Sequence, residues 1–207
     1  MKIYVEGGGD SHLLKTACRK GFSEFVRKAG LEGKMPKIVA CGGRKAAYDA
    51  FSIAAANGEP AILLVDSEAP IDRAHQQGAL AAWTPWEHLK NRTGDGWPQP
   101  GGTSGTACHL MVQCMEAWFF ADRITLAAYF GQGFNNAALP PEHNPIEDIE
   151  KGEIYRSLKN ATKNTKTKGK YDKGEHSFKI LELIDPQKVS AASPWAKRFI
   201  DALVGED

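Results

Sequence analysis

Short apolar runs alternate with amphipathic stretches along the first third of the chain. The runs at 2–5, 37–41 and 61–65 predict strands, and the wholly apolar run at 61–65 is typical of a parallel strand covered on both faces. Apolar residues at three- and four-residue intervals predict a helix ending at Gly30 and another over 45–56. Strands and helices in this order, joined by right-handed crossovers, predict an α/β layer fold.

The pattern is weaker further along the chain. Residues 69–106 combine scattered tryptophans with prolines, which predicts an insertion with an exposed loop. An apolar run at 108–112 predicts a fourth strand, and a long amphipathic helix is expected over 113–130. Further helices are expected near 146–161, 178–184 and 194–203.

Length and composition fit one globular domain. The 207 residues are 42% hydrophobic and 25% charged, which argues against disorder and against a fibrous repeat. The apolar stretches are far shorter than the roughly 20 residues that span a bilayer, and the first residues lack the hydrophobic region of a secretory signal. We therefore expect a cytoplasmic protein without membrane contact. Its expected parts are a core (1–68 and 107–130), an insertion (69–106) and a helical, lysine-rich extension (131–207).

Acidic residues follow two of the predicted strands. Glu6 follows the first strand directly, and Asp10 comes four residues later across three glycines. Asp66 and Glu68 follow the third strand, and their two-residue spacing puts both side chains on one side of an extended segment. Ligands of parallel α/β sheets bind beyond the carboxyl ends of the strands. We therefore expect these four carboxylates to converge at one edge of the sheet.

Such a cluster has a chemical consequence. Packed acids repel one another, so a cation must neutralise them or some must hold protons. Mg²⁺, or Mn²⁺ in its place, favours hard oxygen ligands and combines a few carboxylates with substrate phosphate oxygens. Two such ions can clamp the attacking and leaving oxygens of an in-line displacement. The acids therefore predict Mg²⁺-dependent phosphodiester chemistry.

Simpler explanations exist for the same residues. Glu6 and Asp10 could favour the start of the following helix without any ligand, and Asp66 and Glu68 could form a turn. His109 and His176 are expected to be ordinary hydrogen-bonded residues rather than ligands. The four cysteines have no CxxC spacing and lie in apolar surroundings, so we expect reduced structural thiols.

The acidic motifs also resemble a known superfamily. A glutamate after the first strand and an Asp-x-Glu pair after a later one resemble the Toprim domains of topoisomerases, primases and overcoming-lysogenization-defect nucleases. That superfamily uses a glutamate and an Asp-x-Asp pair, so Glu68 departs from its pattern. The resemblance implies a Toprim-like three-layer fold with a mainly parallel central sheet flanked by helices. It also implies metal binding by Glu6, Asp10, Asp66 and Glu68, with Glu116 as a further acid, and a catalytic role for Lys173.

More closely, the chain resembles a bacterial Toprim-like family catalogued as domain of unknown function 4276. The matching stretches are 5–11, 64–68, 109–122, 171–174 and 176–178. Relatives with such domains often accompany an ATPase in phage-defence systems, and the resemblance suggests such a partner here. Glu116 could instead pair with a base or lie on a solvated helix face, and Lys170 and Lys179 are rivals of Lys173.

Basic and glycine residues predict phosphate contacts. The formal net charge is only +1, but six lysines and one acid lie between residues 159 and 173. We expect Lys166, Lys168 and Lys170 either to contact a nucleic-acid backbone or to form a solvated, mobile loop. Gly42, Gly43, Arg44 and Lys45 lie at a strand-to-helix junction, where backbone N–H groups and two cations could hold a phosphate.

Three functional hypotheses follow. The first is a Mg²⁺-dependent nuclease acting on DNA or RNA, with Glu6, Asp66 and Lys173 as catalytic residues. The second is a catalytically silent binding or effector subunit that acts only with a partner ATPase, because the chain has no Walker motif. A small-molecule phosphotransferase or phosphatase ranks last, since no nucleotide-base pocket is evident. The sequence favours neither DNA nor RNA and does not predict an oligomeric state.

Overall fold

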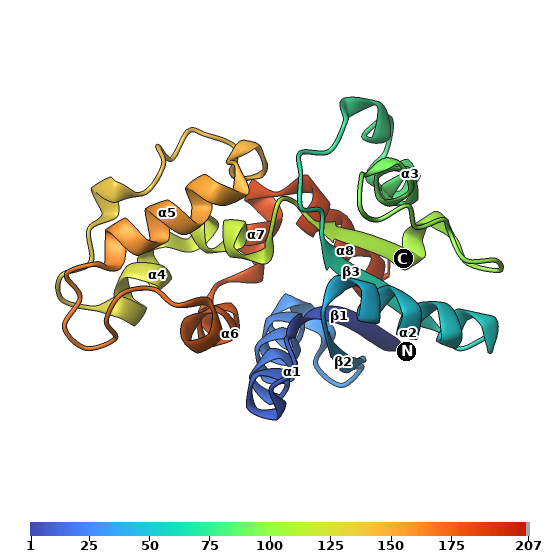
Figure 1. The fold of residues 1–207 in the computed structure, drawn as a ribbon, viewed down its shortest axis with the longest axis horizontal. Helices are drawn as coiled ribbons and strands as arrows, with labels where there is room; N and C mark the ends of the chain where they lie inside the picture. Colours follow the sequence, from blue (N-terminus) through green and yellow to red (C-terminus); the bar gives the residue numbers. More distant parts are fainter. Residues whose placement is uncertain (206–207) are drawn as a thin grey trace.

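A computed structural model describes residues 1–205 as a four-stranded parallel sheet flanked by helices (Figure 1). The spatial order of the strands is β2-β1-β3-β4. The strands are β1 (Lys2–Gly8), β2 (Lys37–Gly42), β3 (Ala61–Asp66) and β4 (Cys108–Met111). The helices are α1 (His12–Val26), α2 (Arg44–Ala56), α3 (Pro85–Asn91), α4 (Arg123–Phe130), α5 (Lys151–Thr162), α6 (Lys173–Leu183), α7 (Pro186–Ala192) and α8 (Pro194–Val204).

The sheet buries both of its faces, as its apolar strands predict. Successive side chains of a strand point to opposite faces, so Ile3 and Val5 of β1 join one core and Tyr4 joins the other. Phe22 of α1 packs in the first core and Phe51 of α2 in the second. The predicted three-layer α/β fold is confirmed.

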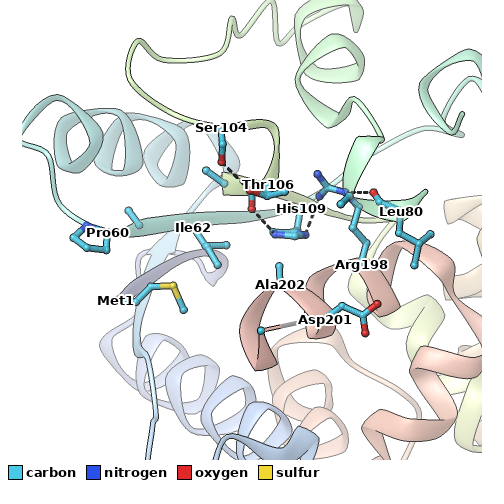
Figure 2. Close-up of a pocket in the computed structure, with 14 residues that line it drawn as sticks. Met1, Pro60, Ile62, Leu80, Ser104, Thr106, His109, Arg198, Asp201 and Ala202 are labelled. Atoms are coloured by element: carbon cyan, nitrogen blue, oxygen red, sulfur yellow. Dashed lines mark hydrogen bonds between the residues drawn. The ribbon is translucent and has the colours of Figure 1, made fainter. Parts of the chain in front are cut away.

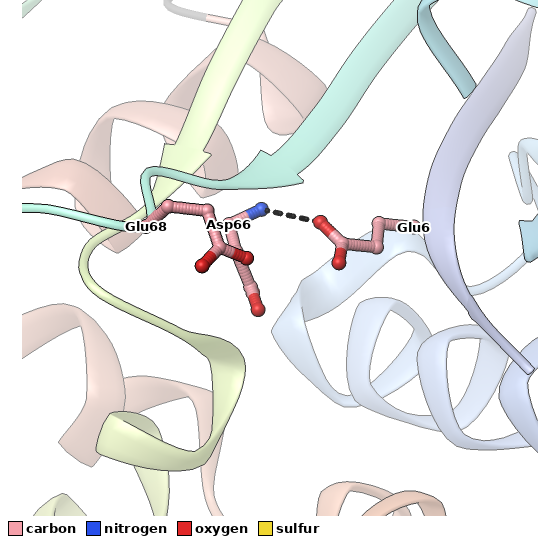
Figure 3. Close-up of side chains that lie close together, drawn as sticks. All are labelled: Glu6, Asp66 and Glu68. Atoms are coloured by element: carbon pink, nitrogen blue, oxygen red, sulfur yellow. Dashed lines mark hydrogen bonds between the residues drawn. The ribbon is translucent and has the colours of Figure 1, made fainter. Parts of the chain in front are cut away.

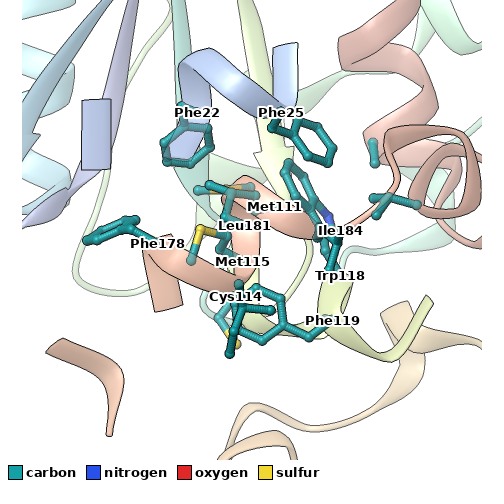
Figure 4. Close-up of a cluster of buried hydrophobic side chains, with 14 of the residues drawn as sticks. Phe22, Phe25, Met111, Cys114, Met115, Trp118, Phe119, Phe178, Leu181 and Ile184 are labelled. Atoms are coloured by element: carbon teal, nitrogen blue, oxygen red, sulfur yellow. The ribbon is translucent and has the colours of Figure 1, made fainter. Parts of the chain in front are cut away.

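The larger core joins the sheet to the C-terminal helices (Figure 4). Phe25 of α1 stacks on Trp118 with 5.1 Å between ring centroids and 17° between planes. Leu181 and Ile184, at the end of α6, lie in the same cluster. Residues more than 90 positions apart in the chain are therefore fixed to one another, and α6 is held against α1.

The long helix predicted over 113–130 is wrong. Residues Met115–Asp122 form a 3-10 helix, and α4 begins only at Arg123. Nearly every side chain of Met115–Asp122 is buried, so this segment has no solvated face. The Asp122 side chain accepts hydrogen bonds from the backbone N–H and hydroxyl of Thr125, which starts a new helix.

The other elements follow the predicted order with shifted bounds. α6 begins at Lys173, five residues before the expected start, because Asp172 accepts the N–H of Glu175 as an N-cap. The unpredicted α7 begins after Asp185, which caps it in the same way. Residues 69–106 form α3 and short turns, and their three tryptophans are buried over α2 and the sheet.

The hydrogen bonds of the buried His109 are satisfied within the fold. His109 donates from Nε2 to Thr106 O at 2.9 Å and accepts at Nδ1 from Arg198 at 3.0 Å. All four cysteines are free thiols. Within residues 1–205 no helix combines the length and the apolar character that crossing a membrane requires.

His109 makes the stability of the protein depend on pH. Burial and the Arg198 charge lower its folded-state pKa to about 3, below the unfolded value near 6.5, so the unfolded state binds a proton that the folded state rejects. This contribution is present above about pH 6.5 and is lost as pH falls. Urea denaturation should show that His109→Gln reduces the loss of unfolding free energy between pH 7 and pH 5 by about 2 kcal/mol. An unchanged pH dependence would contradict this assignment.

Candidate metal centre

Three acids meet at the carboxyl edge of the sheet (Figure 3). Glu6 lies on β1, Asp66 ends the adjacent β3, and Glu68 follows two residues later. One carboxylate oxygen from each lies within 4.8 Å of the others. The Asp66 N–H donates to Glu6 Oε2 at 3.1 Å, which ties the two strand ends together. Residues sixty positions apart in the chain therefore form one acid cluster.

The backbone around Glu68 is held in an unusual conformation. Among the residues that the structure describes, Glu68 and Gln113 are the two non-glycine residues with positive φ, at 63° and 60°. The Glu68 N–H donates to Gln113 O at 3.2 Å, and the Gln113 N–H donates to Ser67 Oγ at 2.7 Å. Left-handed backbone is unfavourable for residues with a side chain and is enriched at functional sites. These bonds fix the direction of the Glu68 side chain.

Glycines let two loops close in beside the acids. A Cβ on Gly8 would lie 2.7 Å from backbone atoms of Lys15, and a Cβ on Gly42 would lie 2.6 Å from Gly9 O. Both glycines also have positive φ, which a side chain would disfavour. The glycines thus have a packing reason to be present and bring backbone close to the cluster.

Two basic residues offset the charge of the three acids. Lys151 Nζ, at the start of α5, lies 2.6 Å from Glu68 Oε1 and 3.6 Å from Asp66 Oδ2. Arg44 donates from Nε to Asp66 O at 3.0 Å and lies 3.6 Å from Glu6 Oε2. Its other nitrogens form a paired contact with Asp95, at 2.5 and 2.9 Å. The guanidinium is therefore committed to protein partners.

Glu116 forms a second acidic position beside the cluster. It is fully buried and accepts hydrogen bonds from Tyr155 at 2.9 Å, Ser177 at 3.0 Å and Tyr171 at 3.3 Å. Lys173 Nζ lies 3.8 Å from Glu116 and donates to the Tyr155 hydroxyl at 3.0 Å. Glu116 therefore does not lie on a solvated helix face, but it does pair with a base, Lys173.

Burial sets the protonation of the cluster. It raises the pKa of Glu6 to about 6, although the Asp66 N–H and Arg44 oppose the shift. Burial raises the pKa of Asp66 as well, and the neighbouring Glu6 and Glu116 raise it further. Burial disfavours the charge of Lys151, but Asp66 and Glu68 outweigh that effect and raise its pKa. Any additional positive charge would therefore stabilise the ionised carboxylates.

A cavity of about 230 Å³ opens beside these groups. Its polar walls come from Glu6, Asp66, Glu116 and Lys173, and its backbone walls come mainly from glycines. The remaining lining residues are Leu14, Met111, Met115 and Phe178, with Gly7, Gly8, Gly9, Gly42 and Gly174. Such a space suits a small polar group that contacts both the acids and the lysine.

Other residues predicted for the site lie apart from the cluster. Asp10 is exposed in the turn before α1, where Ser11 rather than Asp10 caps the helix. Gly43 and Lys45 are exposed at the start of α2, and Lys45 pairs with Asp49 at 2.6 Å. The three lysines predicted to contact phosphates lie exposed in the loop between α5 and α6: Lys166, Lys168 and Lys170.

Several partners of the acids were not predicted from the sequence. Lys151 stands in an acid-rich stretch, and no spacing rule connects it to Asp66 or Glu68. Tyr155 lies four residues later on α5, which places both side chains on the same face of the helix. Tyr171 and Ser177 flank Lys173 in the chain, so the lysine motif itself was the signal that could have identified them.

A larger cavity of about 430 Å³ lies at the opposite edge of the sheet (Figure 2). Its buried polar groups are Arg198 and His109. Arg198 donates to the carbonyls of Leu80, Cys108 and Gly105 at 2.7–2.8 Å, so its guanidinium has no spare donor aimed into the space. The chemically reactive residues therefore gather at the carboxyl edge, in the smaller cavity.

Fold and site together define a parallel α/β protein with an acidic centre at the switch between β1 and β3. A family described as "Domain of unknown function (DUF4276)" matches residues 5–204, and the chain belongs to this family. The predicted relationship to that family is confirmed. No curated protein and no solved structure matches the chain.

Burial of the acid cluster should lower the stability of the metal-free protein. Glu6 has a folded-state pKa of about 6, above its usual value of 4.5, so stability falls as pH rises from about 4.5 to about 6 and the full loss remains above pH 6. Glu6→Gln removes that charge and keeps an oxygen for the Asp66 N–H. In chelator at pH 7.5 it should raise the unfolding free energy by about 1–2 kcal/mol, measured by urea denaturation. Lower stability of the variant would contradict this explanation.

Proposed function

We propose that the protein is a Mg²⁺-dependent, Toprim-type nuclease that hydrolyses phosphodiester bonds of DNA or RNA. The observation that carries this proposal is the convergence of Glu6, Asp66 and Glu68 within 4.8 Å beside a cavity. Buried acids of this kind repel one another unless a cation joins them. The arrangement supports metal-assisted chemistry better than a role in folding, because the acids weaken the fold.

The donors present fit Mg²⁺ or Mn²⁺. Carboxylate oxygens are the ligands these ions prefer, and the described residues place no thiol or imidazole among the three acids. Glu6, Asp66 and Glu68 would hold the ion, and Glu116 is the further acid for a second ion. When bound, the ion would polarise a phosphate and lower the pKa of a water molecule.

The residues around the cavity have roles of their own. Lys173 projects a half-exposed ammonium next to Glu116 and Tyr155, where it can stabilise negative charge that develops on a phosphate. Tyr155, Tyr171 and Ser177 keep the Glu116 carboxylate fixed by hydrogen bonds. Arg44 holds the end of β3 in place rather than the substrate, since Asp95 occupies its guanidinium.

The lysine loop extends away from this centre. Lys151 begins α5 at the acids, and Lys163 follows the last residue of that 12-residue helix, so the loop starts about 18 Å away. The chain then returns to the centre at Lys173. We expect the exposed Lys166, Lys168 and Lys170 of this loop to contact phosphates beyond the bond that is cut, with affinity falling as salt rises.

A second candidate function is an effector subunit that is silent until a partner ATPase acts on it. Lys151 and Arg44 already offset the three acids in the isolated chain, which favours a resting state. Cleavage that appears only when such a partner is added would favour this alternative over an enzyme active alone.

Nuclease activity should depend on the acids and on the metal. Glu6→Gln and Asp66→Asn should each lower cleavage of labelled single-stranded and duplex DNA and RNA by about 100-fold or more in Mg²⁺ or Mn²⁺. Chelator should abolish the wild-type activity. Glu87→Gln, at a half-exposed acid of α3, is the matched control and should cleave like the wild type. Full activity of both cluster variants would end the proposal.

A further inference from the structure

Among residues 1–205, Lys151 makes the closest cationic contact with the acid cluster. Its ammonium lies 2.6 Å from Glu68 and 3.6 Å from Asp66, and its side chain is only 25% exposed. These are carboxylates that we propose as ligands of the metal ion. The ammonium therefore sits where a divalent cation would gain most from the same oxygens.

The contact is built into the fold rather than formed by a loose surface pair. The Lys151 N–H donates to Gln113 Oε1 at 3.3 Å, and Gln113 O accepts the Glu68 N–H at 3.2 Å. A single buried residue in left-handed conformation thus positions both the lysine and the glutamate. The Gln113 Nε2 is buried and has no hydrogen-bond partner in the described part of the chain, so this junction is not fully satisfied with Lys151 in place.

Two cations cannot share this space at low cost. An ammonium a few ångströms from a divalent ion is strongly repelled, and Mg²⁺ requires direct contact with carboxylate oxygens. Lysine carries its charge on a flexible four-carbon stem, so the ammonium can leave while the backbone of α5 stays in place. Glu68 and Asp66 can then turn all of their charge to the ion.

We propose that Lys151 is an exchangeable counter-ion of the metal centre: its ammonium neutralises Glu68 and Asp66 in the metal-free protein and is displaced when a divalent ion binds. The inference rests on the proposed function, because it requires an ion at this cluster. It assigns Lys151 a positioning role that Lys173 does not share, since Lys173 contacts Glu116 rather than the three acids.

If the exchange occurs, removing the Lys151 charge should destabilise the metal-free protein and strengthen binding of the metal ion. Lys151→Met keeps an unbranched side chain and removes the charge, so the metal-free protein loses its counter-ion and its Tm falls. The ion then binds without a competitor, and its Kd should fall about tenfold, which is about 1.4 kcal/mol. The rise in Tm on adding Mg²⁺ should therefore be larger than in the wild type. A purely structural role would lower the Tm equally with and without Mg²⁺.

The test is a Mn²⁺ titration by calorimetry together with thermal unfolding in chelator and in Mg²⁺. Lys151→Arg retains the charge and should bind Mn²⁺ within about threefold of the wild type. Lys197→Met removes a lysine with an equivalent contact, 2.7 Å from Asp201 at the other edge of the sheet, and should bind like the wild type. Lys173→Met also removes a nearby positive charge, but not one that contacts the three acids. Its affinity for Mn²⁺ should therefore rise clearly less than that of Lys151→Met.

The outcomes distinguish this inference from the proposed function. Equal or weaker Mn²⁺ binding by Lys151→Met, or an equal gain in Lys173→Met, would overturn the exchange while leaving the metal centre intact. Absence of Mn²⁺ binding in both the wild type and Lys151→Met would overturn the metal centre and the exchange together.

Discussion

Repulsion among three carboxylates at one edge of a parallel sheet is the constraint around which this structure is arranged. Glu6 lies near the end of β1, Asp66 ends the adjacent β3, and Glu68 is turned toward them by a left-handed backbone. Burial raises the pKa of Glu6 and of Asp66, so the cluster weakens the fold unless positive charge compensates it. Lys151 supplies part of that charge from α5. The buried carboxylates are energetically unfavourable, and several interactions of the surrounding residues hold them in place.

The surrounding packing keeps these groups from moving apart. Phe25 and Trp118 stack between α1 and the segment after β4, and the C-terminal helices close over the same core (Figure 4). That packing holds the starts of α5 and α6 at the carboxyl edge of the sheet. Lys151 and Lys173, the first residues of these helices, therefore lie beside the acids. A rigid core is what permits buried charges to be placed within a few ångströms, because residual repulsion cannot relax into a looser structure.

The sequence predicted the sheet and the three central acids for a physical reason. Buried parallel strands are recognised in the sequence as short apolar runs, and the residues that follow them must meet at one edge of the sheet. Side chains such as Lys151 and Asp95 could not be found in this way, because their partners depend on how distant segments pack. The same limit explains the error over 113–130, where burial on all sides and the Asp122 cap override a helical pattern. Asp10 shows that nearness in sequence does not ensure nearness at the site.

The central claim is that the three carboxylates bind one divalent ion in common. Crystals grown in Mn²⁺ and measured at the manganese absorption edge test it most directly. We expect a strong anomalous peak at bonding distance from oxygens of Glu6, Asp66 and Glu68, with the Lys151 ammonium displaced from Glu68. A map with no peak there, or with Lys151 still paired to Glu68 and the manganese bound elsewhere, would contradict it.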